Sequence, residues 1–296
     1  MKKFSKTLST IALAMGALLA STAGHATVSI GYGGQVATDG SGLTSLYVPA
    51  NNQIGLSNFN GFFLETFDTA TGMFLGVPGL ASNPQTTSSS NPNITIAQPT
   101  GGGCGFNAAG NVGVTTVGGG LGIQKGSMGG VAAAPFGDTT CFGSAPGSQV
   151  GNPTASQGAS AGSPASIFLD YSTLLASPLV KAGQKVSYIG FYLGSIDFYN
   201  SIYLYSGNTV KESISGAQLL GSNAQYVGNQ NSALSNIYVN MYINETEGID
   251  KIEFRSSGVA VEMDNVVVGV PEPESLALMG LGLVALAASR RRKTAK

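Results

Sequence analysis

The sequence predicts an all-β protein: an antiparallel β-sandwich or jelly-roll-like body between an N-terminal signal helix and a short C-terminal transmembrane helix. Apolar and polar residues alternate with a period of two along much of the second half of the chain. Turn residues separate these stretches at short intervals, as they do in sandwiches and jelly rolls. Between the two apolar ends of the chain, the sequence shows no long helical periodicity.

The chain begins with a hydrophobic leader, residues 1–26. Three lysines precede an apolar core, Leu8–Ala20, and small residues follow as far as Ala26. This order is typical of a secretory signal peptide, so we expect cleavage between Ala26 and Thr27. An uncleaved signal anchor is the alternative, although the apolar core is short for one. The body is therefore expected beyond the inner membrane.

The first region of the body, residues 27–163, is rich in Gly, Ser, Asn and Thr. Short apolar islands bounded by Gly, Asn and Pro predict short strands on long loops. Two low-complexity segments, 83–93 and 143–162, predict surface loops. The islands are Val28–Tyr32, Leu43–Val48, Phe59–Phe67, Ile94–Ala97, Val112–Val117 and Leu121–Ile123.

The second region, residues 164–269, has the clearer strand pattern. Val186–Leu193 is apolar at nearly every position, which predicts a central strand covered on both faces. We expect this region to share one domain with residues 27–163, and two small domains divided near Gly151–Ser163 are the alternative. The predicted strands are Ile167–Tyr171, Val186–Leu193, Ser201–Tyr205, Asn236–Asn244, Lys251–Arg255 and Val259–Val268.

The composition of the body excludes several kinds of chemistry. The single histidine, His25, leaves with the leader, and the chain has no Trp. Nucleophilic triads that need His and histidine metal sites are therefore excluded. Eight of the 14 basic and two of the 15 acidic residues lie in the terminal segments, which leaves six basic and 13 acidic residues in the body. This acidic balance argues against nucleic acid as a partner. We predict no cofactor and no metal site.

The two cysteines, Cys104 and Cys141, predict one disulfide, because an isolated pair in an oxidising compartment most often forms a bridge. Two free thiols are the alternative.

The C-terminal segment, residues 270–296, has three parts with separate physical meanings. Its prolines end any preceding strand and hold an extended peptide. Its apolar run is shorter than the ~20 residues of a comfortable spanning helix, which suits a transient membrane stop. Its basic cluster is expected on the cytoplasmic side. The parts are the box Pro271, Glu272 and Pro273, the apolar run Leu276–Ala288, and the cluster Arg290, Arg291, Arg292 and Lys293.

This tripartite order resembles the PEP-CTERM sorting domain of Gram-negative bacteria. The resemblance implies a membrane-tethered precursor that exosortase, a membrane transpeptidase, cuts near the box and releases or transfers to the cell surface or medium. An ordinary tail anchor or a buried terminal helix is the alternative.

Three body segments look similar to a family of exosortase-dependent surface proteins: Val131–Thr140, Gly190–Asn200 and Val261–Val267. The second contains the run Gly-x-Tyr-x-Gly-Ser-x-Asp-x-Tyr-Asn, and the resemblance implies no established activity. Within this run we expect structural roles. Gly194 allows close backbone approach, Asp197 and Asn200 bond their own turn, and Tyr192 and Tyr199 pack across strands. Direct ligand contact by Asp197, Tyr199 and Asn200 is the alternative.

The expected function is that of a non-catalytic surface or extracellular matrix protein, associated with exopolysaccharide or a biofilm matrix. Tyr238, Asn240 and Tyr242 alternate along one predicted strand and are candidate glycan contacts, because tyrosines stack on sugars and an amide bonds hydroxyls. The same stripe is equally the pattern of an ordinary solvent face.

Two alternatives use the acidic residues. A carbohydrate-active hydrolase needs paired carboxylates and no histidine, and the candidate pairs are Glu262 with Asp264 and Glu65 with Asp68. A structural calcium ion takes oxygen ligands, and the candidates are Glu245, Glu247, Asp250, Asp264 and Asn265. We favour neither, and predict no catalytic residues.

Overall fold

The computed structural model describes residues 28–54, 60–68, 91–96, 103–108, 111–147 and 164–270. The predicted signal helix, its cleavage site, the Pro-Glu-Pro box, the C-terminal apolar run and the basic cluster lie outside the described residues. Within the described ranges, no helix has the length and apolar character needed to cross a membrane.

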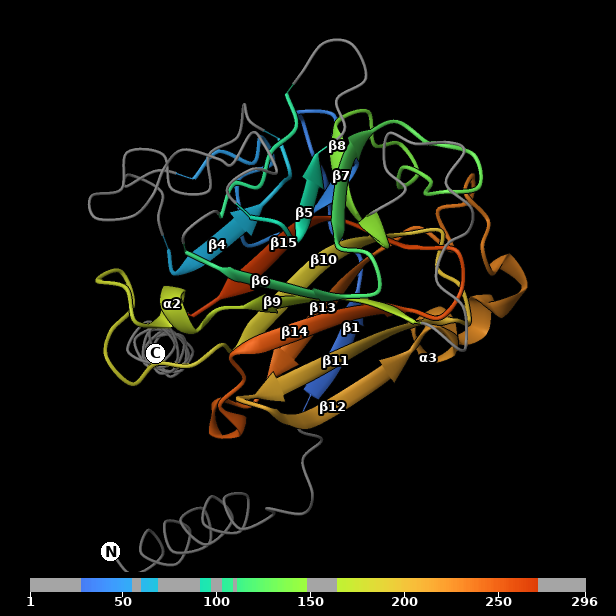
Figure 1. The fold of residues 1–296 in the computed structure, drawn as a ribbon. Coiled ribbons are helices and arrows are strands. Elements are labelled where there is room, and N and C mark those ends of the chain that lie inside the picture. The colour runs from blue at the N-terminus through green and yellow to red at the C-terminus, as the bar shows by residue number, and fades with distance from the viewer. Residues whose placement is uncertain are drawn as a thin grey trace, which may run out of the picture.

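Two β-sheets form the body, and both combine strands from the first and second regions (Figure 1). The larger sheet follows the order β1-β13-β10-β15-β8-β7-β5, and β4 also pairs with β15. Its pairs are antiparallel except β5 and β7, which run parallel. Its strands are β1 (Val28–Tyr32), β4 (Phe62–Glu65), β5 (Ile94–Ile96), β7 (Leu121–Lys125), β8 (Cys141–Ala145), β10 (Tyr188–Gly194), β13 (Ile237–Ile243) and β15 (Val261–Gly269).

The smaller sheet follows the order β12-β11-β14-β9-β6, and its pairs are antiparallel. Its strands are β6 (Gly113–Val117), β9 (Ala165–Asp170), β11 (Asn200–Ser206), β12 (Thr209–Ser215) and β14 (Lys251–Ser256). A short hairpin pairs β2 (Gln35–Val36) with β3 (Leu43–Thr44). The short helices are α2 (Ser172–Leu175), α3 (Gly216–Leu220), η3 (Gly221–Tyr226) and η4 (Glu245–Glu247).

One hydrophobic core lies between the two sheets. It draws buried apolar side chains from strands of both, because the period-two alternation places one face of each strand inward. Phe191 of β10 and Phe254 of β14 meet edge to face across this core, with ring centroids 5.0 Å apart. The prediction of a mostly β fold is confirmed, and side chains of the two sheets pack against each other in this core.

The outer face of the larger sheet is also covered. Residues 34–54, which contain the β2–β3 hairpin, lie against it, and Val48 and Ile54 pack with Phe62, Tyr188 and Val267 in a second apolar cluster. Consequently β10 and β15 are buried at every position. The predicted central strand Val186–Leu193 is thus confirmed as β10, which lies between β13 and β15.

The middle of β15 is irregular at Asn265. This residue has a left-handed φ of 47°, where asparagine is tolerated better than most residues. Before it β15 pairs with β8, and after it with β4. The Asn265 Nδ2 donates to Ser41 O (2.9 Å), Ser41 Oγ (2.8 Å) and Leu43 O (2.9 Å). The irregularity therefore fixes the covering hairpin to the sheet.

The predicted disulfide is confirmed. Cys104 and Cys141 are bonded, with their Cα atoms 5.5 Å apart. Cys141 opens β8, so the bridge attaches segment 103–108 to the larger sheet.

Three strands, β2, β8 and β12, were not predicted, and one loop boundary was wrong. β8 occupies Cys141–Ala145, so residues 143–145 of the expected low-complexity loop are a buried strand. β12 is the exposed edge of the smaller sheet and carries Lys211 and Glu212. The island Leu43–Val48 forms a strand only over Leu43–Thr44.

Candidate functional site

The run Gly190–Asn200 covers the end of β10 and the turn into β11. The turn is anchored by Asn236, whose Oδ1 accepts hydrogen bonds from the amides of Ser195 (2.9 Å) and Phe136 (3.0 Å). Ser195 has a positive φ of 31°, so this double anchor holds a backbone conformation that serine seldom adopts.

Gly194 provides the close approach expected of it. A Cβ at this position would lie 3.2 Å from Pro135 and 3.3 Å from the Cβ of Glu262. Tyr192 is buried, and its hydroxyl donates to Phe136 O at 2.5 Å. The segments Val131–Thr140, Gly190–Asn200 and Val261–Val267, which stand out in the sequence, therefore meet at one place in the fold.

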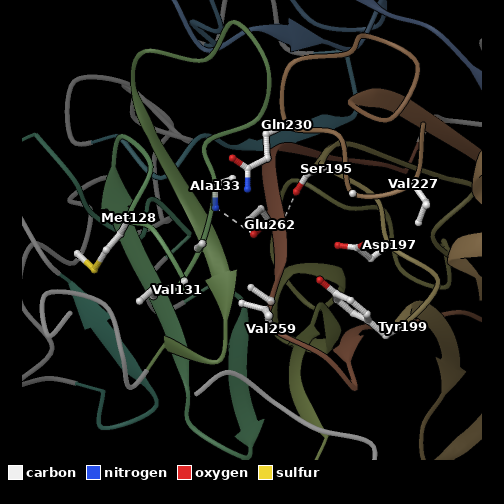
Figure 2. Close-up of a pocket in the computed structure, with 14 residues that line it drawn as sticks. Met128, Val131, Ala133, Ser195, Asp197, Tyr199, Val227, Gln230, Val259 and Glu262 are labelled. Carbon is white, nitrogen blue, oxygen red and sulfur yellow. Dashed lines mark hydrogen bonds between the residues drawn. The ribbon is translucent and has the colours of Figure 1, made fainter. Parts of the chain in front are cut away.

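A pocket of about 440 Å³ opens at this meeting point (Figure 2). Its polar groups come from Ser195, Asp197, Tyr199, Gln230 and Glu262. Its apolar wall is formed by Met128, Val131, Val227 and Val259, with further backbone from Gly130, Ala132, Ala133, Gly228 and Ala260.

Glu262 lies at the centre of the labelled side chains in Figure 2, between Ala133 and Ser195. Its Oε1 accepts from the Ala133 amide at 3.1 Å, and its Oε2 accepts from Ser195 Oγ at 3.3 Å. The side chain is buried, and this burial raises its pKa to about 8 despite the two donors. At neutral pH Glu262 is therefore mostly protonated and offers hydrogen bonds rather than a charge.

Asp197 is the second carboxyl group of the pocket. Its pKa is raised by burial, and a hydrogen bond from the Tyr199 side chain opposes that rise. Burial and the neighbouring carboxyl of Asp197 in turn raise the pKa of Tyr199. The Asp197 carboxyl also packs against Gly228, where a Cβ would lie 2.7 Å from Oδ1. Asp197 and Tyr199 thus form a pair at the pocket surface.

Asn200 has the structural role expected of it. Its Oδ1 accepts from the Asp197 amide at 2.7 Å, and its Nδ2 donates to Ala260 O at 2.8 Å. Because Asn200 is buried and both ends of its amide are bonded, it positions Asp197 and does not line the pocket.

The chemistry of the lining is acidic or neutral. Lys, Arg and His are absent from the described residues that line the pocket. Apolar side chains and carboxyl, hydroxyl and amide groups line the pocket together. Such a pocket suits a neutral ligand with an apolar face and several hydroxyl groups.

The stripe Tyr238, Asn240 and Tyr242 is not a solvent face, and this expectation was wrong. Tyr238 is fully buried and donates to Asn265 O at 3.1 Å, while Asn240 is 7 % exposed and donates to Gly33 O at 2.8 Å. The covering segment 34–54 buries both. Tyr242 keeps an exposed ring, with 42 % of its surface accessible. Tyr238 therefore has no free face on which a sugar could stack.

The carboxyl pairs suggested by sequence spacing do not form. Glu65 is buried, and its two oxygens accept from the amides of Phe67 (2.7 Å), Asn107 (3.0 Å) and Ala108 (2.7 Å). Asp68 instead accepts from the Cys141 amide at 3.0 Å. Neither Glu65 nor Asp68 lines the pocket. Glu65 holds segment 103–108 against β4.

Asp264 does not line the pocket that Glu262 lines. It belongs to a buried acid cluster with Asp138, Asp68 and Asp39. The Asp138 carboxyl hydrogen-bonds that of Asp264, and each keeps one buried oxygen that receives no donor from another described group. A proton shared between the two carboxyls satisfies both oxygens.

The calcium candidates are dispersed among other contacts. Asp250 accepts from the Gly207 amide at 3.0 Å, and Glu247 forms a 3.8 Å ion pair with Lys211. Asp264 and Asn265 lie in the buried cluster and in the irregular part of β15. Over the described part of the chain, no three His, Cys, Asp or Glu residues converge as metal ligands.

Sequence reasoning did not identify Gln230 or Met128 as site residues. Both lie in irregular segments, where no periodicity or motif marks a position, and only the folded arrangement brings them to the pocket.

Comparison with known protein families gives one match: residues 269–293 fit the family model of the PEP-CTERM protein-sorting motif. The match confirms the identification of the C-terminal segment. It implies an exported, membrane-anchored precursor that exosortase recognises. The comparison with curated proteins found no match. The likeness of the three body segments to exosortase-dependent surface proteins stays a prediction.

Proposed function

We propose that this chain is an exosortase-processed component of the cell surface or extracellular matrix, whose β body performs no catalysis. The sorting motif at residues 269–293 carries the proposal. It begins at Gly269, the last residue of β15, and the Val270 amide donates to Gly61 O at 2.8 Å. Cleavage near the box would therefore leave every strand of the body intact.

Two features of the chain support export. The leader, residues 1–26, has the order of a secretory signal. The Cys104–Cys141 disulfide is the kind of link that persists in an oxidising compartment. Both agree with a body that folds beyond the inner membrane, held there by the C-terminal segment until processing.

Extracellular polysaccharide is the partner that we propose for the processed body. The body carries six basic and 13 acidic residues, a poor balance for binding nucleic acid. Its pocket combines an apolar wall with hydroxyl, amide and carboxyl groups and no basic side chain. These groups suit the hydroxyls of a sugar better than a phosphate.

A secreted carbohydrate-active hydrolase is the second candidate, because Asp197 and Glu262 line one pocket. A pKa of about 8 keeps Glu262 protonated at neutral pH, as a general acid requires. Incubating the full chain with the host's own exopolysaccharide separates the two candidates. The non-catalytic proposal predicts no new reducing ends, whereas release that Glu262→Gln abolishes would establish the hydrolase.

Fractionation of the host with and without its exosortase tests the sorting proposal. With the enzyme, the body should reach the surface or the medium, and without it the precursor should remain in the membrane fraction. Glu272→Ala in the box should also retain the precursor, whereas Glu274→Ala, just outside the box, is the matched control. Equal distribution in both strains would contradict the proposal.

A further inference from the structure

The pocket is assembled from segments that lie far apart in the sequence. Met128 and Val131 come from the segment before β8, Ser195 and Asp197 from the end of β10, and Glu262 from β15. Asn236 and Asn200 hold the turn that carries Ser195 and Asp197, by side-chain bonds of 2.7–3.0 Å. The turn that carries Ser195 and Asp197 is therefore fixed before any ligand arrives, which lowers the entropic cost of binding.

The polar groups left for a ligand come from Asp197, Tyr199 and Gln230. Both ends of the Asn200 amide are already hydrogen-bonded within the protein. The Glu262 carboxyl accepts from the Ala133 amide and the Ser195 hydroxyl. Asp197 and Tyr199 are both half-buried at the pocket surface, and Gln230 is exposed. A carboxyl, a phenol hydroxyl and a primary amide together offer several donors and acceptors around one opening.

The charge of the lining selects among ligands. An anionic ligand would meet the Asp197 carboxyl without a basic side chain to pair with, and it is disfavoured. A cation would meet a Glu262 that is mostly protonated at neutral pH, so only one carboxylate would face it. A neutral ligand rich in hydroxyl groups meets neither difficulty.

We infer that this pocket binds one neutral sugar unit of a polysaccharide. The hydroxyl groups of the sugar bond Asp197, Tyr199 and Gln230, and its apolar face lies on Val131 and Val259. The volume of about 440 Å³ falls in the ~300–1,000 Å³ range of small-ligand sites. The inference deepens the proposed function by locating its polysaccharide contact, and it moves that contact away from the buried Tyr238.

Binding is tested with the full chain purified in mild detergent. The probes are immobilised neutral gluco-, galacto- and manno-oligosaccharides, with uronic-acid oligosaccharides of the same lengths beside them. We expect retention on at least one neutral series and none on the uronic-acid series. Retention on neither series, or on the uronic-acid series alone, would overturn the inference.

Variants locate the bound sugar. Asp197→Ala removes a charge-assisted hydrogen bond and should weaken binding ~10-fold or more. Gln230→Ala should weaken binding ~3-fold or more. Because Gln230 is exposed, the melting temperature of this variant should match that of the wild type. Gln225→Ala, an exposed glutamine that does not line the pocket, is the matched control and should bind as the wild type does. If Asp197→Ala and Gln230→Ala both bind as tightly as the wild type, the assignment of the pocket is overturned.

Failure of this inference and failure of the proposed function are distinguishable. A protein that is correctly processed and displayed but binds no neutral sugar overturns the pocket alone. A protein that binds sugar through Asp197 but is sorted equally without exosortase overturns the sorting proposal alone.

Discussion

Ser195 and Glu262 lie 67 positions apart in the chain, yet the Ser195 Oγ donates to Glu262 Oε2 at 3.3 Å. The bond joins the end of β10 to the start of β15, and the pocket lies beside it (Figure 2). The contact therefore joins two segments that are distant in sequence, and each supplies part of one site.

Glu65 should be indispensable for stability. Glu65→Ala leaves three buried amides without an acceptor, at ~1–3 kcal/mol for each unsatisfied group before relaxation. Glu65→Gln should also destabilise by ~2 kcal/mol or more, because its NH₂ group must face an amide donor. Urea unfolding measures both, and Glu212→Gln on the edge strand β12 is the control. Wild-type stability of Glu65→Gln would contradict the assigned role.

The disulfide should contribute substantially to stability. Cys104→Ser with Cys141→Ser opens a loop whose ends are 37 positions apart, which corresponds to roughly 3–4 kcal/mol in the chain-entropy model. Urea unfolding of the double variant and of the reduced wild type should agree. A midpoint equal to that of the oxidised protein would show that Glu65 and the other hydrogen bonds to segment 103–108 hold it without the disulfide.

The buried acid cluster predicts that stability falls as pH rises. Burial raises the pKa of Asp138 to about 6 and that of Asp68 to about 7, and it also raises the pKa of Asp264. Between pH ~4 and these values, the folded protein keeps protons that the unfolded chain has released. Stability is therefore greatest at the acidic end and decreases by up to ~1.4 kcal/mol per pH unit for each retained proton.

Unfolding in urea at pH 5, 6, 7 and 8 measures this dependence. Asp264→Asn should make the pH dependence shallower, because an amide can donate to the Asp138 oxygen without taking up a proton, while Glu65 and Glu262, whose pKa burial raises to about 8, keep part of the slope. Asp170→Asn, outside the cluster, should keep the wild-type slope. Stability that increases from pH 5 to pH 8, or an Asp264→Asn slope equal to that of the wild type, would contradict the shared proton.

Tyr238 and Tyr242 should respond differently to the loss of a hydroxyl. Tyr238→Phe removes the bond to Asn265 O and should destabilise by about 1 kcal/mol. Tyr242→Phe alters an exposed ring and should change stability by less than ~0.5 kcal/mol. Thermal unfolding of the two variants compares them directly. Equal effects would mean that the covering segment 34–54 does not bury Tyr238.

The strands of the second region could be predicted because apolar and polar residues alternate along them, as expected when one face of a strand is buried. Alternation does not predict burial where a second layer covers a sheet: Tyr238 and Asn240 alternate as if exposed, yet both are buried, and Asn240 bonds Gly33, 207 positions earlier in the chain. β8 was missed because Cys-Phe-Gly-Ser-Ala lacks β-branched residues, and β12 because it is a charged edge.

The site was predicted in part. Asp197 and Tyr199 were recognised as alternative ligand contacts, and Glu262 as a candidate carboxyl. The carboxyl group predicted to pair with Glu262 was wrong. Sequence spacing favoured Asp264, whereas the fold brings Asp197 to the same pocket as Glu262. Composition and motifs could not predict that Gln230 lines the pocket, because it lies in an irregular segment.

Intact-mass analysis of the protein from cells and from medium tests the central claim most directly. The account predicts a mature chain that begins at Thr27 and has lost the apolar run and the cluster Arg290–Lys293, with its disulfide intact. Mature protein that still carries Arg290–Lys293 in a cell with working exosortase would contradict it.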